Sequence, residues 1–342
     1  MRIIRPARMA DLPQVESLAK QSLLGVASLP NDLAALEQKL RHSQASFQDP
    51  QTAGDEASYF FVLEDLASGE LLGCSALTAR VGVLEPFYSL RNEVFVHASA
   101  KLQVKNKVGV LALCQDLSGS SLLSSFHVQD ELVGGPFAEL TSRARLMFIA
   151  AQPQLFSRRI VAEMVGQSDS SGNSPFWEAL GRNFFDMDYA KAELLCGQGK
   201  RTFLAELLPR YPIYVPLLSE SAQAVLGRVH PQAQATFELL RREGFETERY
   251  VDIFDAGPTL QAQTSTLRSI AHSRLATVRL GPVAADGKAY LLSNQKLGEF
   301  RATVTQLHWQ EGGPLTLSPS MAAALLLAEG DSIRLIAMEE AA

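Results

Sequence analysis

The region that most constrains the fold is residues 227–259, where a histidine and a proline precede an apolar helix and a glycine ends it. Pro231 follows His230, and a proline fits the first turn of a helix because its missing N–H would have no intrahelical partner there. Apolar residues then recur at helical spacing until Gly244, a residue type that adopts left-handed backbone angles without steric cost. We therefore expect a helix that stops at Gly244, a strand after it, and His230 at the helix entrance.

His230 has two interpretations at this stage. A lone histidine near a helix start is usually a solvated or hydrogen-bonded residue, whereas an imidazole that titrates near neutrality also suits proton transfer in catalysis. Position alone does not separate the two. Residues 176–185 show a similar pattern of helix, glycine and aromatic residues, and we expect the same helix–strand unit there.

The composition is that of an ordinary globular protein, with 46% hydrophobic and 20% charged residues among 342. This length allows two hydrophobic cores or one elaborated domain. The net charge of −6 argues against a nucleic-acid-binding protein, which needs a basic face to neutralise phosphates. No apolar run approaches the ~20 residues that cross a bilayer, and the N-terminus lacks the apolar block of a signal peptide. We expect a cytoplasmic protein that binds neither nucleic acid nor membrane.

The three cysteines, Cys74, Cys114 and Cys196, are widely spaced. An odd and scattered set neither frames disulfides nor supplies a metal site. His97 and His127 have no histidine, cysteine or paired carboxylate at ligand spacing. The sequence therefore predicts reduced cysteines and no metal centre.

The first part of the chain predicts alternating strands and helices. Ile3 and Ile4 form a short strand, and Asp11 lies at the start of a helix that has a proline in its first turn. Residues 30–50 supply a helical insert, after which the segments 59–65 and 71–76 form a hairpin. The expected order is strand, helix, helical insert and two strands.

A strand, a loop, a helix and a strand follow, at residues 122–128, at Gly134-Gly135, through residues 140–149 and at residues 160–165. After residue 260 the pattern changes to short strands between Gly, Pro and Asn turns, with one helix around residues 321–327. We expect one domain over residues 1–260, which could contain a doubled αβ arrangement, and a small β-rich subdomain over residues 261–342. This subdomain carries no catalytic constellation and would cover a sheet edge or face a partner.

Motifs spread from residue 1 to about residue 275 resemble those of the arginine N-succinyltransferase family in order and spacing. They include Ser28-Leu29-Pro30, Gly119-Ser120-Ser121, Val161-Ala162-Glu163-Met164, Ser174-Pro175-Phe176-Trp177, Val229-His230-Pro231-Gln232 and Asp252-Ile253-Phe254-Asp255. Within the family, Glu85-Pro86-Phe87-Tyr88 makes the chain most similar to the alpha subunit of the two-subunit arginine/ornithine succinyltransferase. The resemblance implies an α+β fold of the GNAT type, an acyl-CoA N-acyltransferase fold with a mixed central sheet flanked by helices.

The resemblance also implies a reaction, the transfer of a succinyl group from succinyl-CoA to the α-amine of arginine or ornithine in arginine catabolism. Succinyl-CoA is then a substrate, and no permanently bound cofactor is implied. The histidine that matches His230 is the family's active-site proton donor. This role suits direct attack, because an α-ammonium must lose a proton before it attacks a thioester and the departing thiolate benefits from a donor. The implied partner is a homologous beta subunit, or a second copy of this chain.

The donor site implied by the resemblance consists of Phe126, Val128, Gly134, Gly135 and Ala138. Phe126 matches a family position that contacts succinyl-CoA, and the backbone N–H groups around it would stabilise an oxyanion if the strand bulges and splays. In GNAT folds the loop and the helix start donate N–H groups to the pyrophosphate of coenzyme A.

This loop departs from the usual pattern, because Val133 replaces an arginine or glutamine and Pro136 replaces a glycine and removes one donor. Two functions therefore stay open. Either the chain is a catalytic succinyltransferase subunit with His230 as proton shuttle, or it is a structural or regulatory subunit that supports a catalytic beta subunit.

A guanidinium substrate needs a planar carboxylate partner. The candidates in the sequence are Glu93, Asp186, Asp252 and Asp255. Each of them also fits an ordinary role as a surface or capping residue.

Overall fold

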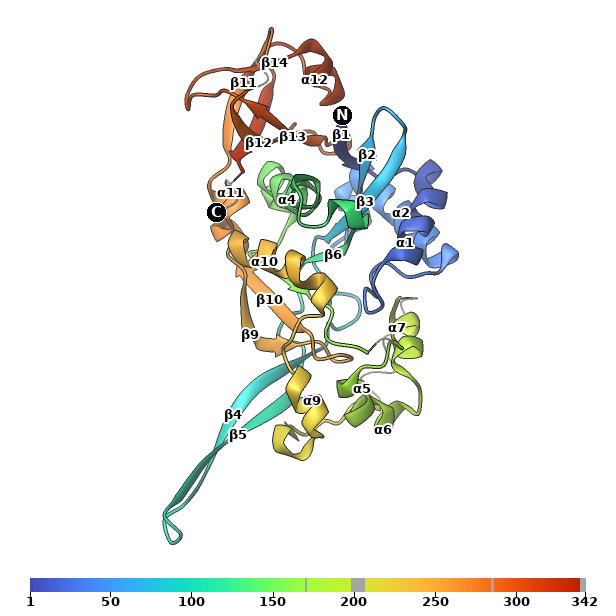
Figure 1. The fold of residues 1–342 in the computed structure, drawn as a ribbon, viewed down its shortest axis with the longest axis vertical. Helices are drawn as coiled ribbons and strands as arrows, with labels where there is room; N and C mark the ends of the chain where they lie inside the picture. Colours follow the sequence, from blue (N-terminus) through green and yellow to red (C-terminus); the bar gives the residue numbers. More distant parts are fainter. Residues whose placement is uncertain (170, 198–206, 284–285, 339–342) are drawn as a thin grey trace.

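The computed structural model describes residues 1–169, 171–197, 207–283 and 286–338, and within them the strands form one continuous sheet (Figure 1). The strands are β1 (Arg2–Pro6), β2 (Ser58–Asp65), β3 (Glu70–Thr78), β4 (Ser89–Ser99), β5 (Val104–Cys114), β6 (Ser121–Val128), β7 (Arg159–Glu163), β8 (Ile213–Tyr214), β9 (Glu246–Val251), β10 (Pro258–Gln263), β11 (Arg274–Leu280), β12 (Lys288–Ser293), β13 (Ala302–Leu307), β14 (Leu315–Leu317) and β15 (Ser332–Ala337).

Their order in the sheet is β14-β11-β15-β12-β13-β1-β2-β3-β6-β7-β10-β9-β4-β5-β8. Among the described strands, β6–β7 and β11–β14 pair in parallel, and the remaining pairs are antiparallel. The sheet is therefore mixed, as an α+β fold requires.

The larger helices cover both faces of the sheet around β2 and β3. The helices are α1 (Leu12–Gln21), α2 (Leu33–Gln48), α3 (Pro50–Ala53), α4 (Pro136–Ala151), α5 (Pro175–Ala179), α6 (Gly181–Phe185), α7 (Tyr189–Gly197), α9 (Glu220–Val225), α10 (Gln234–Glu243), α11 (Arg268–Ala271) and α12 (Pro319–Ala324). In Figure 1, α1 and α2 lie on one side of β2 and β3, and α4 lies on the other.

Strand β2 shows why the sheet needs helices on both faces. Tyr59, Phe61 and Leu63 pack in the core cluster that contains α4, whereas Phe60 and Val62 pack in the cluster that contains α1 and α2. Successive side chains of a strand point to opposite faces, so a strand that is apolar throughout must be covered twice. The predicted hairpin β2–β3 and the helical insert before it are confirmed.

Helix α1 begins after Asp11, as expected, but Asp11 does not cap it with its side chain. The carboxylate instead accepts hydrogen bonds from the guanidinium of Arg5, at 2.6 and 2.8 Å, and from the backbone N of Arg8 at 2.7 Å. The Asp11 carboxylate, which the sequence suggested as a helix cap, is therefore paired with Arg5, a buried arginine on β1.

The helix of the 227–259 region is confirmed as α10. A short 3-10 turn, Pro231–Ala233, leads into it, and Gly244 ends it with a left-handed φ of 107°. Strand β9 follows directly.

The same unit does not recur at residues 176–185, so that prediction was wrong. Helices α5 and α6 follow one another there, and α7 comes next in place of a strand. Gly181 does not end a helix before a strand here. A Cβ at this position would lie 2.2 Å from a ring carbon of Trp177. Gly181 therefore permits close packing around Trp177, and the Phe185 ring stacks on the indole with centroids 5.3 Å apart.

The C-terminal region is rich in short strands, as predicted. Strands β11–β15 and α12 enclose a core of their own, which includes Val278, Leu292, Leu315 and Leu335. This region continues the main sheet through β13, which pairs with β1. The division at residue 260 stays a prediction; β10 spans that position and pairs with β7 and β9.

Strands β4 and β5 form a long hairpin that extends away from the rest of the molecule (Figure 1). Its base pairs with β9 and β8. Further out, Val94, Val96 and Leu102 are exposed by 61%, 54% and 72%. We call residues 92–106 the hairpin arm.

Candidate functional site

The parallel strands β6 and β7 separate part-way along their length. Their pairing stops at Leu123 and Ala162, although β6 continues to Val128. On its other side, the register between β6 and β3 shifts, and Ser125 takes a left-handed φ of 51°. An extra residue of this kind is a β-bulge, which bends the strand. The bulge and splay that the donor site requires are therefore present.

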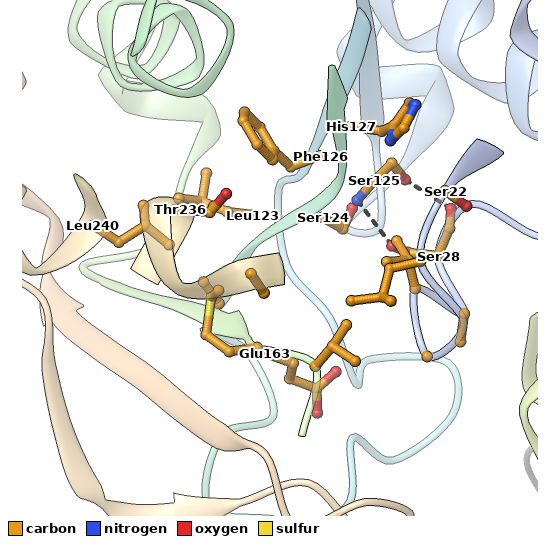
Figure 2. A pocket seen from close by; sticks show the side chains of 18 of the residues that line it. Ser22, Ser28, Leu123, Ser124, Ser125, Phe126, His127, Glu163, Thr236 and Leu240 are labelled. Carbon is orange, nitrogen blue, oxygen red and sulfur yellow. Dashed lines mark hydrogen bonds between the residues drawn. The ribbon is translucent and has the colours of Figure 1, made fainter. Parts of the chain in front are cut away.

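Ser28 holds this bulge in place from the loop after α1. Its Oγ accepts a hydrogen bond from the backbone N of Ser125 at 2.8 Å, and its carbonyl accepts one from Ser125 Oγ at 2.7 Å (Figure 2). These two bonds satisfy polar groups of the bulge, including a backbone N–H that it removes from the β-ladder.

A cavity of about 670 Å³ lies where β6 and β7 separate (Figure 2). Its walls include residues 21–28, residues 122–128 of β6, the loop 133–135, residues 162–165 and 252–255, and the first turns of α4 and α10. This volume lies in the range of small-molecule binding sites.

All five residues of the expected donor site line this cavity. Phe126 and Val128 contribute from the bulged strand, and Gly134, Gly135 and Ala138 contribute from the loop and the start of α4. Figure 2 shows Phe126 and His127 on opposite sides of β6. The structure thus brings together the residues that the sequence placed in one site.

The loop before α4 forms a helix N-terminus with one donor missing. Gly135 is the N-cap, Pro136 is the first helical residue, and Gly134 has a left-handed φ of 74° that favours glycine. Backbone N–H groups in the first turn, including those of Phe137 and Ala138, have no intrahelical acceptor and can bind an anion. Pro136 fits this turn without strain, yet it supplies no N–H.

Carboxylates surround the same helix end. Asp130 and Glu131 lie in the 3-10 turn just before the loop, and Glu139 lies in the first turn of α4, where it forms an ion pair with Arg143. Negative charges close to the loop in sequence oppose the binding of a pyrophosphate, although Arg143 partly neutralises Glu139. The loop therefore retains the geometry of an anion site with weakened electrostatics.

His230 lies at the helix entrance, as predicted, but not on the wall of the large cavity. Its backbone N donates to the Val165 carbonyl at 2.8 Å, and its Nδ1 accepts from the backbone N of Gln232 at 3.2 Å. It lines a smaller neighbouring hollow together with Asp169, and Gln232 borders both hollows. Burial lowers the pKa of His230 below its ordinary value of 6.5, which favours the neutral imidazole at pH 7.

Two of the four candidate carboxylates line the cavity, namely Asp252 and Asp255. The other two lie outside it. Glu93 forms an ion pair with Arg91 on β4, at 2.7 Å, and Asp186 is the exposed C-cap of α6.

Asp255 is buried and joins three segments of the wall. Its Oδ2 accepts hydrogen bonds from the backbone N of Gly166 at 2.7 Å and from the Tyr189 hydroxyl at 3.1 Å, and its Oδ1 accepts from Gly257 N at 2.7 Å. Burial, with a smaller effect from the nearby Asp252, raises the pKa of Asp255 to about 8. This carboxyl group therefore gives up its proton only at mildly alkaline pH.

Sequence reasoning missed several charged residues of the cavity, among them Glu163, Glu193 and Arg145. Glu163 lies at the end of β7, where the two strands separate (Figure 2). It stood in one of the family motifs, which was the one signal that could have pointed to it. Glu193 and Arg145 lie inside helices α7 and α4, where charged side chains are usually solvated.

Within the described ranges, no group of three or more His, Cys, Asp or Glu side chains is arranged to hold a metal ion. No disulfide bond joins Cys74, Cys114 and Cys196. Among the described helices, none has the length and apolar character needed to cross a membrane.

Two family models together cover nearly the whole chain. One, described as the arginine N-succinyltransferase beta subunit, matches residues 2–269, and its C-terminal domain model matches residues 274–337. The chain belongs to the arginine N-succinyltransferase family. It is therefore an enzyme of the acyltransferase class. The expected α+β fold, with a mixed central sheet flanked by helices, is confirmed.

Individual relatives agree with this assignment. The chain is 56% identical to the arginine N-succinyltransferase subunit alpha of Pseudomonas aeruginosa, over 99% of this chain and 100% of the relative, and 40% identical to the subunit beta of the same organism, over 98% and 97%. The expected similarity to an alpha subunit is thus confirmed. A solved structure of the arginine/ornithine succinyltransferase subunit AI from Pseudomonas aeruginosa matches with a TM-score of 0.92 and 53% identity, over 99% of each chain.

Proposed function

We propose that the chain transfers the succinyl group of succinyl-CoA to the α-amine of arginine or ornithine, by direct attack of the amine on the thioester. One observation carries this proposal. The bulged opening between β6 and β7 is lined by all five expected donor residues and, on its other wall, by carboxylates. Donor and acceptor can therefore meet in one cavity.

The donor side suits an acyl thioester. The pantetheine arm of coenzyme A enters past the loop 133–135 and follows β6 beyond Val128 and Phe126. We assign the stabilisation of the oxyanion of the tetrahedral intermediate to backbone N–H groups around Phe126 and Val128, because the N–H of Ser125 already donates to Ser28 Oγ. No covalent intermediate on the protein is needed.

The acceptor side suits a cationic amino acid. Glu163, Glu193, Asp252 and Asp255 all line the cavity, so this wall is rich in acidic side chains. A guanidinium or an alkyl ammonium is stabilised by carboxylates in such a site. Asp252 is the carboxylate that we assign to the side-chain cation, because burial raises the pKa of Asp255 and favours its neutral form. Asp252 Oδ1 also accepts hydrogen bonds from the backbone N of Phe254 at 2.7 Å and of Asp255 at 3.1 Å.

His230 serves as the proton shuttle in this proposal. With Nδ1 accepting from the backbone N of Gln232, the neutral ring that burial favours carries its proton on Nε2. Uptake of the α-ammonium proton on Nδ1 breaks this contact and gives an imidazolium, whose Nε2 proton then passes to the departing thiolate.

A homologous subunit is the partner that we propose, or a second copy of this chain when that subunit is absent. The two Pseudomonas relatives are named as alpha and beta subunits of the same enzyme. The hairpin arm supplies a suitable surface, since exposed Val94, Val96 and Leu102 stand clear of the body. We place the protein in the cytoplasm, in keeping with its cysteines, which no disulfide joins, and with its thioester substrate.

A second candidate function has its own observation in favour. Pro136 and the surrounding Asp130 and Glu131 weaken the pyrophosphate site, as expected for a structural or regulatory subunit that supports a catalytic beta subunit. Both candidates predict the same fold, so activity of this chain must separate them.

The test is a transfer assay on the chain with and without its partner. Arginine and ornithine are offered with succinyl-CoA or acetyl-CoA, free thiol is followed with a chromogenic reagent, and the product is identified by mass spectrometry. N-succinylarginine or N-succinylornithine is the expected product. Transfer from acetyl-CoA alone, or no transfer at all, would contradict the proposal.

A further inference from the structure

Arg145 is a buried cation on the wall of the cavity. It projects from the third turn of α4, is 1% exposed, and lines the cavity. Its guanidinium donates to the carbonyls of Ala76 at 3.5 Å, Ser124 at 3.3 Å and Ser142 at 3.1 Å, and to the Ser142 hydroxyl at 3.0 Å. All of these acceptors are neutral. Among the described residues Nη2 has one acceptor, although it carries two hydrogens.

In the part of the chain that the structure describes, no carboxylate forms an ion pair with Arg145. The one ionisable group that favours its charge is Cys74, and burial raises the pKa of that thiol to about 12, so Cys74 is neutral at pH 7. Burial lowers the pKa of Arg145 to about 9, which still leaves it protonated. A buried charge without a counter-ion is costly, and its retention calls for an explanation.

Arg143, on the same helix, shows how this fold neutralises a buried arginine. It is also 1% exposed, and it pairs with Glu139 and with Glu243, the latter at 2.9 Å. Its Nε donates to Ser269 Oγ at 2.8 Å, and it does not line the cavity. Helix α4 therefore carries two buried arginines. Arg143 does not line the cavity and is neutralised, whereas Arg145 lines the cavity and has no counter-ion among the described residues.

Strand β6 gives an order of residues along the cavity wall, starting from the loop 133–135. Val128 is nearest in sequence to the loop 133–135, Phe126 lies further along, and Ser124, whose carbonyl accepts from Arg145, lies beyond the bulge. The guanidinium carbon of Arg145 is 5.6 Å from the centre of the Phe126 ring. A long ligand that enters at the loop and passes Phe126 brings its far end to Arg145.

We propose that Arg145 binds the free carboxylate of the succinyl group and selects succinyl-CoA over donors with uncharged acyl chains. This inference rests on the proposed function, because a succinyl thioester carries one carboxylate at the end remote from sulfur. That carboxylate supplies the missing counter-ion and an acceptor for the second Nη2 hydrogen. The other cationic lining residue, Arg242, is exposed at the last turn of α10.

The experiment compares the binding of succinyl-CoA and butyryl-CoA to the full chain by calorimetry. Butyryl-CoA has the same carbon chain without the carboxylate. We expect the wild-type protein to bind succinyl-CoA about 10- to 100-fold more tightly, as one charge-assisted hydrogen-bonded pair provides. Arg145→Met should reduce this ratio to below about threefold, and Arg145→Lys should give an intermediate ratio.

Arg143→Met is the matched control, because it removes a buried arginine from the same helix that does not itself line the cavity. Its partner Glu139 does line the cavity, at the loop that the coenzyme A parts of both ligands share, so an effect there falls on both ligands equally. Arg143→Met should lower thermal stability and leave the binding ratio unchanged. A purely structural Arg145 would weaken both ligands equally in Arg145→Met, which would overturn the inference.

A measurement on the wild-type protein covers the case in which Arg145→Met does not fold. Succinamoyl-CoA, in which a neutral amide replaces the carboxylate, should bind at least about tenfold more weakly than succinyl-CoA. Equal affinities would overturn the inference. Since these readouts need no turnover, a chain that discriminates the donors yet succinylates neither amino acid would refute the proposed function and leave Arg145 in its role.

Discussion

Among the cavity residues, Asp255 is the one whose protonation we expect to affect the stability of the fold. Its carboxyl group is buried, and burial raises its pKa to about 8, far above the ~3.9 of an aspartate in an unfolded chain. The folded state therefore holds this proton more tightly than the unfolded state does. The resulting stability is fully present below about pH 4 and is lost as the pH rises toward 8.

We expect Asp255→Asn to flatten this dependence, because an amide does not titrate. Between pH 6 and pH 8 the wild type should lose up to about 1.4 kcal/mol of unfolding free energy per pH unit from this group. Asp255→Asn should be less stable at pH 6, since it gives up an acceptor, yet show a shallower decline. Thermal unfolding followed by circular dichroism at pH 6, 7, 8 and 9 measures both. Asp186→Asn, at an exposed position, is the control and should keep the wild-type slope, and a wild-type slope in Asp255→Asn would refute the assignment.

Among the elements, the start of α4 determines how well the donor is held. Pro136 removes one N–H from the helix end, and Val133 brings no cation to a loop already flanked by carboxylates. We expect the unmodified chain to bind succinyl-CoA weakly, and Val133→Arg with Pro136→Gly to tighten it by about tenfold or more. Calorimetry on the isolated chain tests this. Submicromolar affinity in the unmodified chain would show that coenzyme A is held in another way.

Elements that neighbouring residues in the chain determine could be predicted from the sequence. Elements that depend on residues distant in the chain could not. The apolar run of β2 and the stop at Gly244 carry their own explanation, and both predictions are confirmed. The glycine at residue 181 looked equivalent, but its role is set by the Trp177 ring.

The same distinction applies to the site. The donor residues share one short stretch of chain, so a family resemblance could group them, whereas Ser28 reaches Ser125 across 97 residues. Arg145 owes its position to carbonyls of β3 and β6, 69 and 21 residues away in sequence. Contacts between residues so far apart in the chain leave no local pattern in the sequence. The position of His230 in a neighbouring hollow likewise has no local pattern that predicts it.

At the scale of the whole molecule, the exposed apolar side chains of the hairpin arm are not explained by packing within the described part of a single chain. The exposed Val94 and Val96 lie on a strand that pairs with β9 at the base of the arm. Such apolar surface is expected in an interface with a homologous subunit.

We expect Val94→Asp with Val96→Asp to weaken subunit association at least about tenfold, because two charges would be buried in the interface. The melting temperature of the free chain should change little, since both side chains already face solvent. Light scattering after size-exclusion chromatography, at several concentrations and with the partner present, measures association. Leu275→Asp, at an exposed position on β11, is the control. Unchanged assembly in the double variant would place the interface elsewhere.

The central claim is that this chain itself carries out succinyl transfer with His230 as the proton shuttle. The direct measurement uses the complex with a partner subunit inactivated by a His-to-Gln change at the position matching His230, so that any product comes from this chain. We expect N-succinylarginine to form with the wild-type chain, and His230→Gln to lower its kcat by roughly 10² to 10⁴ with an unchanged circular dichroism spectrum. His272→Gln, at an exposed position, should have no effect. Absence of product with the wild-type chain would make it a supporting subunit, and a loss of less than about threefold in His230→Gln would remove this histidine from the mechanism.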